Sequence, residues 1–153
     1  MQALELKVPP VPLTAIFAAA MFGLSLLSPS ANFVLPGSKF ASLGLVLLGA
    51  VIALAGVWAF RASKTTVNPL TPSAAATIVS TGVYRFSRNP IYLGFLLVLA
   101  AWAAYLSNAL AVMLLPTFVA YVNRFQIKPE ERALLAKFGA RFSEYMAAVR
   151  RWV

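Results

Sequence analysis

The sequence has no cysteine, no histidine and no aspartate among its 153 residues. Without cysteine there is neither a disulfide bond nor a thiolate nucleophile, and the lack of histidine and aspartate excludes most metal sites and most familiar acid–base pairs. We therefore expect no bound metal. Charged residues are also scarce, at 11% of the chain, about half the share that a soluble domain carries.

Hydrophobic residues take the place of the missing charges. They make up 61% of the chain, with a mean hydropathy of +0.81, and they gather into runs close to the ~20 residues that a membrane-spanning helix needs. We predict an all-α, integral membrane protein of one domain, with four transmembrane helices at about 12–28, 40–61, 90–106 and 108–125. None of the apolar runs contains an ionisable residue, which argues against a proton-coupled transporter or an ion channel.

The end of the chain has a different pattern. Pro129 opens a helix, and Glu130 and Glu131 lie over the positive end of its dipole. Apolar residues then recur at three- to four-residue spacing, at Leu134, Phe138, Phe142 and Val149. We predict an amphipathic cytoplasmic helix over 129–148 that lies against the membrane surface or the bundle.

The basic residues are distributed unevenly. With four spans, all of them except Lys39 fall on the side of the two termini and of the loop at 61–80. The positive-inside rule assigns this side to the cytoplasm, and we expect a bacterial inner membrane. The net charge is +9, but the basic residues flank apolar runs. The expected partners are therefore membrane lipids or an anionic ligand, and not nucleic acid.

The stretch 80–94 is a polar, basic turn held between apolar runs. We expect Asn89 to cap the helix that follows and Pro90 to be its first residue. Tyr84 and Tyr92 flank the turn with amphipathic rings. A solvated linker does not need this combination, so the pattern favours a ligand site, although interfacial tyrosines are a structural alternative.

An ordered set of short motifs runs through the second half of the chain. The motifs are Gly82-Val83-Tyr84, then Arg88-Asn89-Pro90-x-Tyr92-x-Gly94, then Glu130-Glu131 with Leu134, Phe138-Gly139 and Tyr145. As a set, they resemble the isoprenylcysteine carboxyl methyltransferase and phospholipid methyltransferase superfamily of integral membrane enzymes. Asn89 stands where that family has a histidine.

The resemblance implies methyl transfer from S-adenosylmethionine to a lipophilic acceptor with a carboxylate, thiol or amine headgroup. The cofactor residues that it implies are Thr77, Ile78, Val79, Tyr84, Asn89, Pro90, Ile91, Tyr92 and Glu130. The family also uses an arginine shortly before the acidic pair to hold the substrate. Gln126 occupies the aligned position here, and Arg124 is the nearest arginine, so Arg124 is the expected substrate residue.

Two other functions remain open. Sterol reductases resemble the same C-terminal region and bind NADPH there, and a non-catalytic membrane protein could keep the fold with Asn89 in place of histidine. Glu130 and Glu131 also have a structural alternative as acids that complement the helix dipole.

The charge distribution predicts that both termini and residues 61–90 are cytoplasmic. Single-cysteine labelling at Ser73 and Ser30 tests this, because the chain has no native cysteine to interfere. We expect an impermeant thiol reagent to label Ser30→Cys from outside intact cells and Ser73→Cys only after the cells are broken. Labelling of Ser73→Cys in intact cells would overturn the orientation.

Overall fold

The structure is a computed structural model that describes residues 5–63 and 75–153. Most of the loop predicted at 61–80, with Lys64 and the labelling position Ser73, lies outside the described residues. Of the described residues, 77% are helical and none is in a strand, which confirms the all-α prediction. The main helices are α1 (Pro10–Leu27), α2 (Ser38–Ala62), α3 (Pro90–Leu106), α4 (Ala109–Val122), α5 (Lys128–Phe138) and α6 (Ala140–Ala148).

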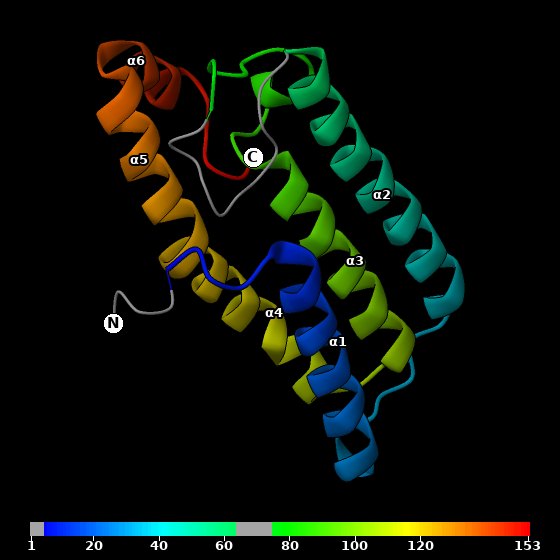
Figure 1. The fold of residues 1–153 in the computed structure, drawn as a ribbon. Coiled ribbons are helices and arrows are strands. Elements are labelled where there is room, and N and C mark those ends of the chain that lie inside the picture. Colours follow the sequence, from blue (N-terminus) through cyan, green and yellow to red (C-terminus); the bar gives the residue numbers. More distant parts are fainter. Residues whose placement is uncertain (1–4, 64–74) are drawn as a thin grey trace.

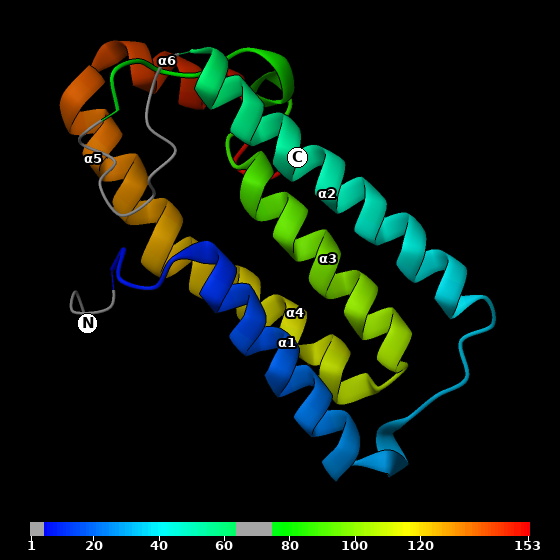
Figure 2. The same cartoon turned by 45° about the vertical axis from the view of Figure 1, so that its right-hand side comes forward.

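The helices form a bundle around α3, with α5 and α6 at one end of it (Figures 1 and 2). α2 packs along α3, and α1 packs on both α3 and α4, whereas α1 and α2 have hardly any contact with each other. The core lies between α1, α3 and α4, at the fully buried side chains of Met21, Leu99, Ala111, Phe118 and Val122. The fold is that of an integral membrane protein, because its helices are apolar on their outer faces as well.

Three helices are long and apolar enough to cross a membrane, and the apolar α3 is slightly shorter. The last of the three is a continuous helix over Ala109–Phe138, because α4 passes into α5 through a π-helical turn, η5 (Asn123–Ile127). Its 30 residues make it about 45 Å long at a rise of ~1.5 Å per residue. A hydrocarbon core is only ~30 Å thick, so the charged α5 projects beyond the membrane-spanning part.

The predicted amphipathic helix over 129–148 is interrupted. Gly139 has a φ of 55° and separates α5 from α6, so the continuous helix that we expected is wrong. Glycine reaches positive φ angles without the steric penalty that other residues have. The break turns α6 away from the axis of α5 (Figure 1) and brings its buried Phe142 towards the bundle.

Asn108 caps α4 and ties together the two connections at the other end of the bundle. Its side-chain oxygen accepts hydrogen bonds from the backbone N–H groups of Leu110 (3.0 Å) and Ala111 (3.2 Å). Its amide nitrogen donates to Asn32 Oδ1 (2.7 Å) and Ser28 O (3.1 Å). A fully buried polar side chain is thereby satisfied.

The close packing of α2 on α3 depends on facing glycines. A Cβ atom at Gly94 would lie 2.6 Å from the carbonyl oxygen of Gly49 and 2.7 Å from the Cβ of Ala53. We predict that Gly94→Ala destabilises the protein by about 1–3 kcal/mol, the usual cost of overpacking, as measured by thermal unfolding in detergent. Gly44→Ala on α2 is the matched control, because its Cβ would meet nothing within 4 Å. Equal stability of the two variants would contradict this packing.

Candidate active site

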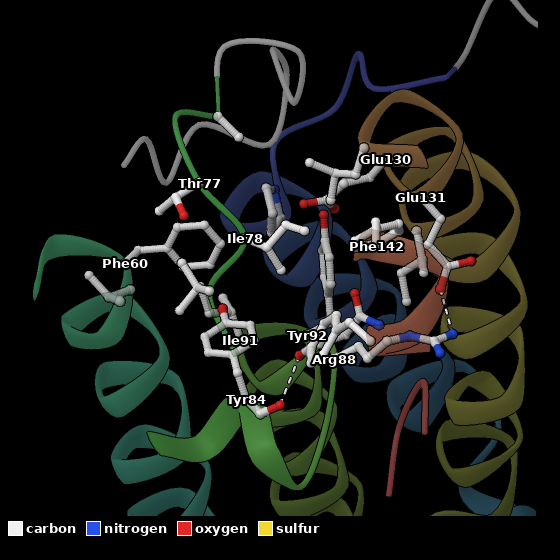
Figure 3. Close-up of a pocket in the computed structure, with 18 of the residues that line it drawn as sticks. Phe60, Thr77, Ile78, Tyr84, Arg88, Ile91, Tyr92, Glu130, Glu131 and Phe142 are labelled. Atoms are coloured by element: carbon white, nitrogen blue, oxygen red, sulfur yellow. Dashed lines mark hydrogen bonds and ion pairs between the residues drawn. The ribbon is translucent and has the colours of Figure 1, made fainter. Parts of the chain in front are cut away.

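A cavity of about 280 Å³ lies at the end of the bundle that carries α5 and α6 (Figure 3). All of the predicted cofactor residues except Pro90 line it: Thr77, Ile78, Val79, Tyr84, Asn89, Ile91, Tyr92 and Glu130. Pro90 is buried at the first turn of α3. The structure therefore brings these residues together from the 75–80 segment, the turn η4 (Gly82–Arg85), α3 and α5. Their role in binding stays a prediction.

Aromatic side chains form much of the wall. The rings of Phe60 and Tyr84 meet edge to face, with centroids 5.2 Å apart. The Tyr145 hydroxyl donates a hydrogen bond of 2.8 Å to the backbone oxygen of Tyr84. The ring of Phe142 lies beside the ring of Tyr145. Burial raises the pKa of Tyr145 to about 12 and the pKa of Tyr84 well above its usual value. Neither phenol is ionised near neutral pH, so neither serves as a phenolate base.

Glu130 and Tyr92 face each other across this cavity. Figure 3 shows the Tyr92 ring rising towards the Glu130 carboxylate. The Tyr92 hydroxyl is buried without a hydrogen-bond partner among the described residues, and Glu130 forms no ion pair with any described residue. Burial, with the negative charge of Glu131 as a smaller cause, raises the pKa of Glu130 to about 7. A raised pKa is what burial produces in a carboxylate that has no cation beside it among the described residues.

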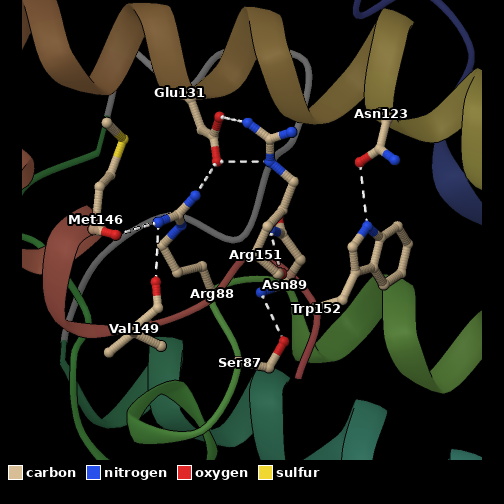
Figure 4. A network of polar contacts seen from close by, with 9 residues as sticks. All are labelled: Ser87, Arg88, Asn89, Asn123, Glu131, Met146, Val149, Arg151 and Trp152. Carbon is tan, nitrogen blue, oxygen red and sulfur yellow. Dashed lines mark hydrogen bonds and ion pairs between the residues drawn. The ribbon is translucent and has the colours of Figure 1, made fainter.

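The neighbouring acid, Glu131, is paired with two arginines (Figure 4). Its Oε1 lies 2.8 Å from Arg88 Nη2, and its Oε2 lies 2.6 Å from Arg151 Nη2. Arg88 donates two more hydrogen bonds through Nη1, to the backbone oxygens of Met146 (2.6 Å) and Val149 (2.8 Å). Glu131 therefore connects the start of α3 to α5 and to the C-terminal tail.

The C-terminal tail is fixed at further points beside the cavity. Asn89 donates from its side-chain nitrogen to the backbone oxygen of Arg151 (2.9 Å), and the N–H of Arg88 donates to the oxygen of Arg150 (3.0 Å). Trp152 Nε1 donates to Asn123 Oδ1 (3.1 Å). Asn89 stands at the cap position of α3, but its side chain makes no capping hydrogen bond. The expectation of an Asn89 cap is wrong, because its amide bonds to the tail.

Arg124, the predicted substrate residue, does not line the cavity. Its guanidinium lies 2.9 Å from Glu5, which also pairs closely with Arg132. The hydrogen bond from Arg124 is the main reason why the pKa of Glu5 is lowered. Gln126, at the aligned position, is buried and donates to the backbone oxygen of Val8 (2.8 Å). In this structure both side chains hold the segment before α1 against η5.

Sequence reasoning missed several residues of the cavity wall: Pro10, Val11, Val57, Phe60, Phe95, Leu134, Phe142 and Tyr145, together with Arg88 and Glu131. Phe142 belongs to the apolar stripe of the last helix, and its spacing indicated burial but not the partner. Phe60 ends the second apolar run and carried no signal of its own. Arg88 lies inside the quoted motif, but an arginine beside a membrane helix is more commonly a lipid anchor, so the sequence alone does not assign it to the cavity.

This chain is similar to known proteins over the region that contains the site. A family model described as phospholipid methyltransferase matches residues 38–141, which include most of the cavity wall. The chain belongs to the phospholipid methyltransferase family. An uncharacterized protein of Haemophilus influenzae is 43% identical over 63 residues, which are 41% of this chain and the whole of that protein. No solved structure matches the chain. Membership of the family supports a methyltransferase activity on lipid-like substrates.

The two adjacent acids should differ in what they stabilise. Glu131→Gln leaves the mostly buried Arg88 without its carboxylate (its side chain is 12% exposed), and we predict a loss of about 3 kcal/mol of folding stability, the low end for a broken buried pair. Glu130→Gln breaks no ion pair with a described residue and should leave stability unchanged or raise it. Thermal unfolding in detergent measures both. Equal losses would contradict the distinction.

Proposed function

We propose that this protein transfers a methyl group from S-adenosylmethionine to a lipophilic acceptor at the cytoplasmic face of the membrane. The observation that carries the proposal is a cavity walled by aromatic side chains in which the Glu130 carboxylate lies opposite the Tyr92 hydroxyl. Within residues 5–63 and 75–153, the carboxylate has no ion-pair partner and the hydroxyl has no hydrogen-bond partner. S-adenosylmethionine has a positive sulfonium, an ammonium group and a flat adenine. A lone carboxylate and aromatic faces suit positive charge, and the apolar wall suits adenine.

The residues present fit this cofactor. Glu130 would hold a positive group and in doing so gain the cation that its environment lacks. Arg88 has a buried Nε–H without a hydrogen-bond partner among the described residues, and it would donate this hydrogen bond to an anionic group of cofactor or acceptor. Arg88, which lines the cavity, is better placed for this than Arg124.

The cofactor supplies an already activated methyl group, so the protein has mainly to position the reactants and exclude water. Phe60, Phe142 and Tyr145 would shield the reacting groups. No histidine base is required if the acceptor arrives as a carboxylate or thiolate, or as an amine that loses its proton afterwards. The lack of histidine in the chain is thus compatible with the chemistry.

The geometry favours this function over NADPH binding. A nicotinamide dinucleotide carries a pyrophosphate, which proteins usually bind with glycine-rich backbone and basic side chains. Among the described residues that line the cavity, Arg88 is the basic one, and it is already paired with Glu131. Glu130 would repel a phosphate.

The cofactor should bind more weakly when Glu130 loses its charge. We predict that Glu130→Gln weakens S-adenosylmethionine binding by about 1–3 kcal/mol, the range for leaving a charged group unpaired, as measured by calorimetry. Glu144→Gln is the matched control, because Glu144 is exposed on α6 and does not line the cavity. An unchanged affinity for Glu130→Gln would remove the main support for the proposal.

Binding should also depend on pH. The free Glu130 carboxylate has a pKa raised to about 7, and a bound cation would lower it. The affinity is then fully present above the free pKa and falls as the pH drops below about 7, by up to tenfold per pH unit. We expect Glu130→Gln to abolish this slope between pH 5 and 7. Parallel slopes for the two proteins would assign the titration to another group.

The acceptor is expected to reach the cavity from the bilayer, because the α3–α4 hairpin over 91–122 contains no charged residue. Partition into lipid gains ~0.8 kcal/mol per buried methylene. We predict that methylation rates rise with tail length in a homologous series of acceptors, measured with the methyl-labelled cofactor. If short, water-soluble acceptors react equally well, access is from the cytoplasm alone.

A further inference from the structure

A second cavity, which adjoins the proposed active site at Val11 and Phe95, lies in the membrane part of the bundle. It is a groove of about 690 Å³ between α1 and α2, with α3 as its floor. It exists because α1 and α2 both pack on α3 and hardly contact each other, and Figure 2 shows α3 between the two helices. Its walls are almost wholly apolar, with Leu43, Val46, Val98 and Leu99 among them.

The groove has the length of one lipid leaflet. Along α3 it extends from Phe95 to Tyr105, about 15 Å at ~1.5 Å per residue. This is half of the ~30 Å hydrocarbon thickness. One end lies at mid-bundle depth, where Phe95 and Val11 also line the first cavity, and the other lies at the membrane surface opposite the proposed active site.

Unsatisfied polar groups occur only at that surface end of the groove's described lining. Ser42 is 7% exposed, and its hydroxyl has no hydrogen-bond partner among the described residues. Lys39, one helical turn before it, pairs with no acidic side chain of the described chain. Deeper in the groove, Thr14 Oγ1 donates to Pro10 O (2.8 Å) and Trp102 Nε1 donates to Ala18 O (3.0 Å), so those groups are satisfied.

We propose that the groove binds an anionic phospholipid of the leaflet opposite the proposed active site, with an acyl chain along α3 and the phosphate at Lys39 and Ser42. A leaflet-long apolar channel matches one acyl chain. The single ammonium and the unsatisfied hydroxyl at its outer end match a phosphate by charge and by hydrogen bonding. The tail of the methyl acceptor is the weaker candidate for this groove. Its headgroup would lie at the proposed active site, at the end of the bundle away from Lys39, and Lys39 would then have no anionic partner.

Trp102 lines the groove and provides a local probe. In the variant Trp58→Phe/Trp152→Phe it is the remaining tryptophan of the chain. Phosphatidylglycerol or phosphatidylcholine with a brominated acyl chain is added to the detergent-purified full chain, and quenching of Trp102 fluorescence reports a bound chain. The same measurement is made with Lys39→Gln, with Ser42→Ala and with Lys128→Gln, a control that removes one charge from the exposed start of α5.

We expect brominated phosphatidylglycerol to quench Trp102 at about fivefold lower concentration than phosphatidylcholine, the effect of one lysine near an anionic headgroup. Lys39→Gln should abolish this preference, Ser42→Ala should reduce it, and Lys128→Gln should leave it intact. Equal quenching by both lipids, or a preference that survives Lys39→Gln, would overturn the proposal. If a brominated methyl acceptor quenches Trp102 instead, and equally well in Lys39→Gln, the groove is the route by which the acceptor enters and the proposal is overturned. No methylation is measured, so the result is independent of the proposed enzymatic function.

Discussion

The ion pairs of Glu131 with Arg88 and Arg151 are the interaction on which the cavity depends. They join three segments that are distant in sequence: the turn before α3, the first turn of α5 and the C-terminal tail. Arg88 also holds the end of α6 through the backbone oxygens of Met146 and Val149. Together with the hydrogen bond from the Tyr145 hydroxyl to the backbone oxygen of Tyr84, this junction holds α6 and its Phe142 over the cavity. The Glu131 carboxylate therefore shapes the cavity through the ion pairs that it forms.

The same arrangement gives the adjacent carboxylate a different role. Glu131 takes both arginines, so Glu130 has no ion-pair partner among the described residues, and burial raises its pKa to about 7. Of the two consecutive acids, Glu131 stabilises the fold, and Glu130 is the one that we propose binds a positively charged ligand. Asn89 also contributes to the fold, because its side-chain nitrogen donates a hydrogen bond to Arg151 O and so holds the tail.

The sequence predicted the helices well, because continuous apolar runs leave few alternatives in a membrane. The cap of α4 was predictable to one of two residues, Ser107 or Asn108, because both lie between two apolar runs; in the structure it is Asn108. The break at Gly139 was not, because the apolar stripe continues across it and only the backbone angle shows the turn. The sequence also did not indicate the partner of Arg124, because Glu5 lies more than a hundred residues away. The motif residues pointed to one site. Which of Glu130 and Glu131 forms ion pairs depends in part on Arg151 in the C-terminal tail, and no local sequence pattern reveals this contact.

The most direct test of the account is a comparison of two ligands by calorimetry with the detergent-purified protein. S-adenosylhomocysteine shares the adenine and the ammonium of S-adenosylmethionine, whereas NADPH brings phosphates to the same cavity. The account predicts that S-adenosylhomocysteine binds at one site, that Glu130→Gln weakens this binding if Glu130 holds the ammonium, and that NADPH gives no binding heat. Binding of NADPH without binding of S-adenosylhomocysteine would contradict it and favour a reductase.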